Sequence, residues 1–189
     1  ILMHGLGDSL ESYKVLAKEI NVTGLSYLLL NAPKKYYFGY SWYDLPPKDP
    51  NPGIRNSVEL ILKLIHELVE TNEHISYQDI FLAGFSQGGC IALECAYQLS
   101  QQLAGIALLS PRIYPDNLPK GNLSKCLETT PLFCAHGTND PVINIEQTKS
   151  GIESLKAKGA AVDFFPYEME HEIDIDEIIQ LRSWLNEYL

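Results

Sequence analysis

Hydrophobic residues along this chain alternate between short apolar runs and longer stretches in which they recur every three or four positions. The short runs predict β-strands at 25–31, 79–84, 105–110, 131–136 and 162–167. These runs are mostly apolar throughout, so both faces of the predicted sheet should be covered. The opening residues, ILMHG, read as the end of a further buried strand, and we expect the first strands to be truncated at the N-terminus.

Helical periodicity separates the predicted strands, at 54–72, 87–100, 144–158 and 174–189. The first of these helices carries one apolar stripe, formed by Val58, Leu62, Ile65 and Val69. The alternation of strand and helix predicts the α/β class, with a mostly parallel sheet and helices on both faces. Two stretches interrupt this order, at 32–53 and 111–130, and both are expected to be irregular loops.

Length and charge limit what this protein can be. The 189 residues suit a single domain that spans 1–189. A formal net charge of −10 argues against nucleic acid as a partner, because phosphate backbones bind basic surfaces. No apolar run approaches the roughly 20 residues that span a bilayer. We therefore expect no nucleic-acid partner and no stable insertion into a membrane.

The four cysteines show neither a CxxC pair nor the spacing of a metal site. Cys90 and Cys95 fall in a predicted apolar helix, and Cys134 falls in a predicted apolar strand. We expect all four thiols to be reduced and buried, which is typical of a cytoplasmic protein. The helix segment at 66–70 lacks the second histidine of a zinc helix, so no metal site is expected.

The segment GFSQGG, at 84–89, is the most informative motif in the chain. It is a G-x-S-x-G pattern between a predicted strand and a predicted helix, which is the setting of a nucleophile elbow. The sharp turn should force Ser86 into a strained backbone conformation. Gly84, Gly88 and Gly89 have no Cβ atoms to obstruct the close approach of strand and helix. The motif predicts Ser86 as a nucleophile at the sheet edge.

A serine nucleophile needs a base and an acid that orients the base. In α/β hydrolases the acid and then the histidine follow the serine along the chain. Asp140 and His171 each follow a predicted strand, so both are expected beside Ser86 at one edge of the sheet. His136 is expected to order its loop through a buried hydrogen bond. Four other acids are weaker alternatives, namely Asp163, Glu168, Asp174 and Asp176.

The segment HGLGD, at 4–8, is a candidate for the loop that stabilises an oxyanion. One donor would be the N–H of Gln87, which follows the nucleophile, and the other the N–H of Leu6. The segment does not complete a G-x-G-x-x-G pattern, so nucleotide binding is disfavoured. This chemistry requires no metal or organic cofactor.

Five motifs occur in order along the chain, HGLGDS, SWYD, GFSQGG, HGTNDPV and YEMEH. With them the chain resembles the phospholipase/carboxylesterase family, which includes acyl-protein thioesterases. The resemblance implies an α/β-hydrolase fold with little or no cap domain, and hydrolysis of carboxylic esters or acyl thioesters. It also implies the same catalytic residues, Ser86, Asp140 and His171.

The chain departs from the family pattern at two places. Glu170 stands where family members usually carry a glycine before the catalytic histidine. Pro111 and Arg112 follow Ser110 where the family tends to have Ser-Gly, so the pocket wall near the acyl group should differ. Both departures concern the substrate more than the catalytic step.

Together these residues predict a serine hydrolase that acts through an acyl-enzyme on a small acyl ester or an acylated peptide. Trp42 and Tyr43, from the aromatic segment at 36–43, are expected to bind substrate, with Pro111 in the pocket wall. Three alternatives remain open: a peptidase or amidase on the same scaffold, a non-catalytic binding protein with a hydrolase fold, and a structural protein that assembles through the aromatic segment. A monomer or a weak homodimer is expected.

Overall fold

A computed structural model describes residues 1–189 and contains a six-stranded, all-parallel sheet in the order β2-β1-β5-β6-β7-β8. Its strands are β1 (Leu2–Met3), β2 (Leu29–Leu30), β5 (Phe81–Phe85), β6 (Gly105–Leu109), β7 (Leu132–Gly137) and β8 (Val162–Tyr167). The strands predicted at 79–84, 105–110, 131–136 and 162–167 are confirmed. The run at 25–31 contributes only the two residues of β2.

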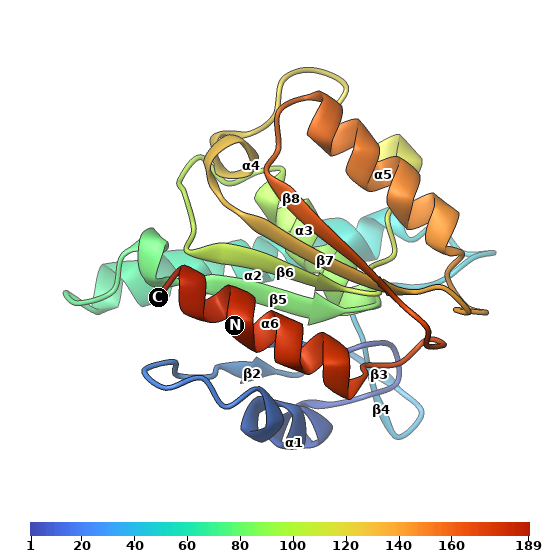
Figure 1. The fold of residues 1–189 in the computed structure, drawn as a ribbon, viewed down its shortest axis with the longest axis horizontal. Coiled ribbons are helices and arrows are strands. Elements are labelled where there is room, and N and C mark those ends of the chain that lie inside the picture. Colours follow the sequence, from blue (N-terminus) through green and yellow to red (C-terminus); the bar gives the residue numbers. More distant parts are fainter.

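The helices cover both faces of the sheet, as predicted for the α/β class. They are α1 (Leu10–Ile20), α2 (Asn51–Thr71), α3 (Gln87–Ala96), α4 (Lys125–Thr129), α5 (Ile145–Ala157) and α6 (Ile175–Glu187). Residues of α1 and α6 form one hydrophobic cluster with the sheet, and residues of α2, α3 and α5 form the cluster on the other face. Figure 1 shows α1 and α6 together on one side of the strands.

The predicted loop at 32–53 is more regular than expected. Its residues form an antiparallel hairpin of β3 (Lys34–Tyr36) and β4 (Gly39–Ser41), and α2 already begins at Asn51. The hairpin is held by non-local bonds, because the Gly7 N–H donates to the Tyr40 carbonyl and the Tyr40 N–H donates to the Asp8 carbonyl. Local sequence carries no sign of this docking, so the strands were not predicted.

Two further expectations need correction. The loop at 111–130 contains α4 and a short turn of 3-10 helix at Pro115–Asn117. The buried face of α2 includes Ile61, whereas Leu62 and Val69, both predicted on that face, are only partly buried. Leu62 lies beside the buried stripe of α2 and not at its centre, so its side chain packs at the edge of the core.

Helix α6 begins with a capping box that fixes the chain just after His171. The Asp174 carboxylate accepts from the Asp176 N–H at 2.7 Å, and the Glu177 carboxylate accepts from the Asp174 N–H at 3.3 Å. Glu177 is fully buried, and its second carboxylate oxygen has no partner. Burial raises the pKa of Glu177 to about 8.

All four cysteines are unpaired and buried, as expected. Burial raises the pKa of each thiol above its ordinary value. None of the helices combines the length and the apolar character needed to cross a membrane.

Candidate active site

Ser86 occupies the turn between β5 and α3 in a strained conformation. Its φ is 54° and its ψ is −111°, a region that L-residues rarely adopt. The Ser86 N–H donates to the Leu109 carbonyl at 2.9 Å, and the Cys90 N–H donates to the Ser86 carbonyl at 3.0 Å. These two bonds tie the residue to β6 and to the first turn of α3, so the structure around Ser86 enforces the strain predicted from the motif.

The glycines of the motif permit three close backbone approaches. A Cβ on Gly84 would lie 2.2 Å from the Gly88 carbonyl carbon, where β5 meets α3. A Cβ on Gly88 would lie 2.3 Å from the Met3 carbonyl oxygen, so this glycine brings α3 against β1. A Cβ on Gly89 would lie 3.0 Å from the Pro111 Cβ. No side chain fits at Gly84 or Gly88, and this explains the glycine-rich sequence.

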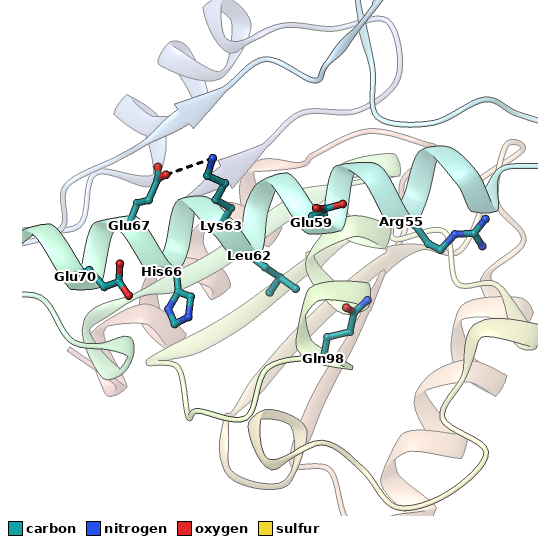
Figure 2. Close-up of a pocket in the computed structure, with 8 residues that line it drawn as sticks. All are labelled: Arg55, Glu59, Leu62, Lys63, His66, Glu67, Glu70 and Gln98. Carbon is teal, nitrogen blue, oxygen red and sulfur yellow. Dashed lines mark ion pairs between the residues drawn. The ribbon is translucent and has the colours of Figure 1, made fainter.

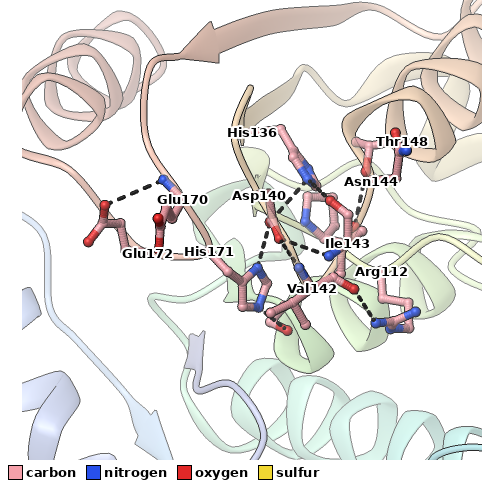
Figure 3. A network of polar contacts seen from close by, with 12 residues as sticks. Arg112, His136, Asp140, Val142, Ile143, Asn144, Thr148, Glu170, His171 and Glu172 are labelled. Carbon is pink, nitrogen blue, oxygen red and sulfur yellow. Dashed lines mark hydrogen bonds and ion pairs between the residues drawn. The ribbon is translucent and has the colours of Figure 1, made fainter.

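The structure brings Ser86, His171 and Asp140 together at the carboxyl edge of the sheet. His171 Nε2 lies 2.9 Å from Ser86 Oγ, and His171 Nδ1 lies 2.6 Å from Asp140 Oδ2. Figure 3 shows the His171 ring beside Asp140, with one ring nitrogen toward that carboxylate. The Asp140 side chain is completely buried, whereas the His171 side chain is 15 % exposed. The three residues come from three separate loops, after β5, β7 and β8.

The Asp140 carboxylate is held as an anion by its own loop. Its Oδ1 accepts from the N–H groups of Val142 and Ile143, both at 2.8 Å. Burial alone would raise the pKa of Asp140, but the Ile143 N–H, the His171 ring and the Val142 N–H hold it below its ordinary value. His136 Nε2 lies 2.9 Å from the Ile143 carbonyl, so His136 orders this loop as expected.

The HGLGD loop lies directly beside Ser86. A Cβ on Gly5 would lie 3.6 Å from the Ser86 Cβ. No backbone carbonyl accepts the Leu6 N–H, and the Ser86 side chain caps no N–H of α3, where Gln87 is the first residue. The N–H groups of Leu6 and Gln87 are therefore free of the fold's own acceptors.

Trp42 and Tyr43 do not line an open groove, contrary to the expectation that they bind substrate. Their exposed fractions are 2 % and 0 %, because both pack in the core on the α2 and α3 face. They contact the residue after the nucleophile: Gln87 Oε1 accepts from the Trp42 N–H at 3.0 Å, and Gln87 Nε2 donates to the Tyr43 carbonyl at 3.0 Å. The segment 41–43 therefore holds Gln87 in place.

The two departures from the family pattern lie on different sides of the site. Pro111 is buried against α3 and accepts from the Thr148 hydroxyl at 3.3 Å, so it belongs to the scaffold beneath the surface. Glu170 is exposed, and no hydrogen bond joins its side chain to the His171 ring. Glu170 therefore does not form a second carboxylate partner for His171.

Sequence reasoning missed the role of His4, the first residue of the HGLGD segment, which is completely buried. Its Nε2 accepts from the Ala32 N–H at 3.1 Å, so the ring proton lies on Nδ1, which donates to the Gly5 carbonyl at 2.6 Å. Burial is the main reason why the pKa of His4 is lowered, so the ring is neutral. The sequence signal that could have revealed this role is the position of His4 directly before Gly5 in the HGLGD segment.

Two surface depressions accompany these residues. One, of about 310 Å³, is lined by His171, Phe85 and residues of α1 and α6. The other, of about 760 Å³, lies on the outer face of α2 and is lined mostly by charged side chains (Figure 2). The second contains none of the predicted site residues, whereas the first adjoins the candidate active site through His171.

Solved structures with the same fold are found among plant and other esterases. The crystal structure of Arabidopsis thaliana SOBER1 superposes with a TM-score of 0.84 at 24 % identity, covering 99 % of this chain and 96 % of that one. The structure of esterase PE8 superposes with a TM-score of 0.86 at 23 % identity, covering 100 % and 91 %. Together with the parallel sheet, these likenesses show the α/β-hydrolase fold.

The chain belongs to the phospholipase/carboxylesterase family, whose pattern matches residues 1–189. Acyl-protein thioesterase 1 from Yarrowia lipolytica is 31 % identical over 208 residues, which cover 99 % of this chain and 90 % of the relative. Carboxylesterase SOBER1 from Arabidopsis thaliana is 27 % identical over 202 residues, with coverage of 99 % and 89 %. The protein is thus a hydrolase of the esterase and thioesterase class.

Proposed function

We propose that this enzyme cleaves acyl esters or thioesters by nucleophilic catalysis at Ser86. His171 Nε2 accepts the proton of the Ser86 hydroxyl as its oxygen attacks the substrate carbonyl, and an acyl-enzyme forms when the protonated ring gives that proton to the leaving group. Water then attacks the acyl-enzyme by the same route and releases the acid. Asp140 keeps the proton of the neutral ring on Nδ1 and stabilises the charged ring.

One observation carries this proposal: His171 lies within hydrogen-bonding distance of both Ser86 Oγ and Asp140 Oδ2. In this mechanism the N–H groups of Leu6 and Gln87 bind the oxyanion, because neither is taken by a backbone acceptor within the fold. Loss of one such donor typically costs about 3 kcal/mol of transition-state stabilisation.

The names of the relatives point to the substrate class. The curated relatives are acyl-protein thioesterases and carboxylesterases, so we propose an acyl ester or an acylated peptide as the substrate. The unpaired, buried thiols support a cytoplasmic location.

Hydrolysis of p-nitrophenyl butyrate by the wild type and Ser86→Ala tests the proposal. We expect Ser86→Ala to lower kcat by a factor on the order of 10⁶, because nucleophile and base act as a unit. A fluorophosphonate probe should label the wild type at Ser86 and leave the variant unlabelled. Full activity in the folded variant, or labelling at another serine, would rule out this mechanism and favour a different nucleophile. A wild type that neither cleaves the ester nor reacts with the probe would favour a binding protein.

A further inference from the structure

Both the backbone and the side chain of Arg112 form hydrogen bonds to the candidate active site, yet the proposed mechanism gives this residue no role. Its backbone N–H donates to the Ser86 carbonyl at 3.3 Å. Its Nη2 donates to the carbonyl of Val142 at 3.2 Å, and the Val142 N–H in turn donates to Asp140. The guanidinium therefore lies against the loop that carries Asp140. Figure 3 shows Arg112 beside Val142 and on the opposite side of His171 from Glu170 and Glu172.

No carboxylate neutralises this guanidinium, although the chain has 24 acidic residues against 14 lysines and arginines. Arg112 takes part in none of the ion pairs of the structure. The partly buried acid Glu94 accepts instead from the Asn117 amide at 2.7 Å. An arginine has five N–H donors, and only the one to Val142 is engaged here.

The neighbouring polar side chains leave these donors free. The hydroxyls of Tyr43 and Tyr114 are buried without a hydrogen-bond partner, and the two rings pack edge to face with centroids 6.0 Å apart. Burial raises the pKa of both hydroxyls, and the nearby Arg112 charge opposes that rise. Neither hydroxyl bonds to the guanidinium, so four of its donors have no protein acceptor.

We propose that Arg112 determines specificity by binding an anionic group, a carboxylate or a phosphate, that the substrate carries near its scissile carbonyl. A planar guanidinium with free donors is suited to both anions, which it binds through paired, charge-assisted hydrogen bonds. The net charge of −10 repels an anionic ester at long range, so any preference for such an ester must come from a local cation. This inference rests on the proposed ester hydrolysis and names the substrate class of the same site.

Matched pairs of esters test the proposal, with the ratio of kcat/KM for the charged over the neutral member as the readout. In one pair the acyl group differs: the mono-p-nitrophenyl ester of glutaric acid against p-nitrophenyl pentanoate. In the other pair the leaving group differs: m-carboxyphenyl butanoate against phenyl butanoate. The ratio is internal to each variant, so a loss of folded enzyme or a shift of the Asp140 loop cancels, whereas loss of an anion contact does not.

We expect Arg112→Gln to lower this ratio about tenfold in one of the two pairs, since a hydrogen bond to a charged group contributes that much. The pair that responds shows whether the anion is on the acyl or the leaving group. Arg112→Lys should retain part of the preference. Arg55→Gln, on the outer face of α2, is the matched control and should keep the wild-type ratio.

Two negative outcomes are distinguishable. If the wild type cleaves the neutral esters and Arg112→Gln has the wild-type ratio in both pairs, the anion site is wrong while the hydrolase function stands. If the wild type cleaves none of the four esters, the proposed function fails and the anion site fails with it.

Discussion

The indole N–H of Trp42 donates to the carbonyl oxygen of His4 at 2.8 Å, and this bond joins the segment after β4 to the loop beside Ser86. The His4 ring in turn donates to the Gly5 carbonyl, which belongs to the same peptide group as the Leu6 N–H. A fixed carbonyl fixes the opposite end of a planar peptide group. The His4 ring therefore orients the Leu6 N–H that we propose as an oxyanion donor, and Trp42 fixes the preceding peptide group, between His4 and Gly5.

Trp42→Phe should break this contact, because it keeps one aromatic ring and removes the indole N–H; the smaller side chain also leaves part of the buried volume empty, which adds a packing cost. The buried His4 carbonyl would lose its partner, at a cost of about 1–3 kcal/mol in the free energy of unfolding. We expect kcat on p-nitrophenyl butyrate to fall about tenfold as the Leu6 N–H loses its orientation. Urea denaturation and steady-state kinetics measure the two effects.

Tyr43→Phe is the control for that experiment, since the Tyr43 hydroxyl is buried without a partner. Its removal should leave the free energy of unfolding unchanged or slightly raised. If both variants lose the same stability, the indole bond has no special role.

Asp140→Asn should preserve the fold of the loop and reduce catalysis. The amide oxygen can still accept from the N–H groups of Val142 and Ile143, but the uncharged side chain no longer stabilises a charged His171 ring. We expect kcat to fall by about 10⁴ with little change in KM. A decrease of less than tenfold in a folded variant would show that Asp140 does not act through His171.

Gly88→Ala should be strongly destabilising, because the new methyl group would lie 2.3 Å from the Met3 carbonyl oxygen and no flexible side chain is available to move. Overpacking of this kind typically costs about 1–3 kcal/mol, and a clash with backbone lies at the upper end. Gly121→Ala is the matched control, since nothing lies within 4 Å of a Cβ there. Thermal unfolding of both variants should show a large decrease in Tm for Gly88→Ala alone.

Glu177→Gln should remove a pH-dependent loss of stability. Because burial raises the pKa of Glu177 from 4.5 to about 8, the folded protein binds a proton that the unfolded chain releases. Between these two pH values the wild type should therefore lose about 1.4 kcal/mol of stability per pH unit that the variant does not lose. Below pH 4.5 Glu177 is protonated in both the folded and the unfolded state. The wild type and the variant should then show the same pH dependence of stability.

Urea denaturation of the wild type and Glu177→Gln at several pH values measures this effect. Glu187→Gln provides the control, because Glu187 is exposed near the end of the same helix. Equal pH dependence in the wild type and Glu177→Gln would show that the Glu177 carboxyl titrates normally.

The sequence predicted the parallel strands at the centre of the sheet because buried strands are apolar throughout. It also placed Ser86, Asp140 and His171 at one edge, since each follows a strand in a fixed chain order. The hairpin of β3 and β4 was missed because, besides the pairing of its own two strands, it depends on hydrogen bonds to residues 7 and 8, far from it along the chain.

Side-chain direction was the other limit of sequence reasoning. Trp42 and Tyr43 belong to an aromatic segment whose outer members, Tyr37 and Phe38, are exposed by 87 % and 105 %. Composition alone does not distinguish a ring that enters the core from one that faces water. Only the docking of the hairpin against the HGLGD loop turns Trp42 inward, where its N–H meets His4.

Because every thiol is buried, no sulfur nucleophile on the protein surface competes with Ser86 for a reagent. Cys90, Cys95, Cys126 and Cys134 are inaccessible and disfavoured as thiolates, so soft electrophiles such as maleimides have no ready target on the folded protein. A covalent inhibitor directed at Ser86 therefore meets no competing thiol on the folded protein. The selectivity of such an inhibitor would then depend on the other serine hydrolases in the sample, because the thiols of this protein are inaccessible.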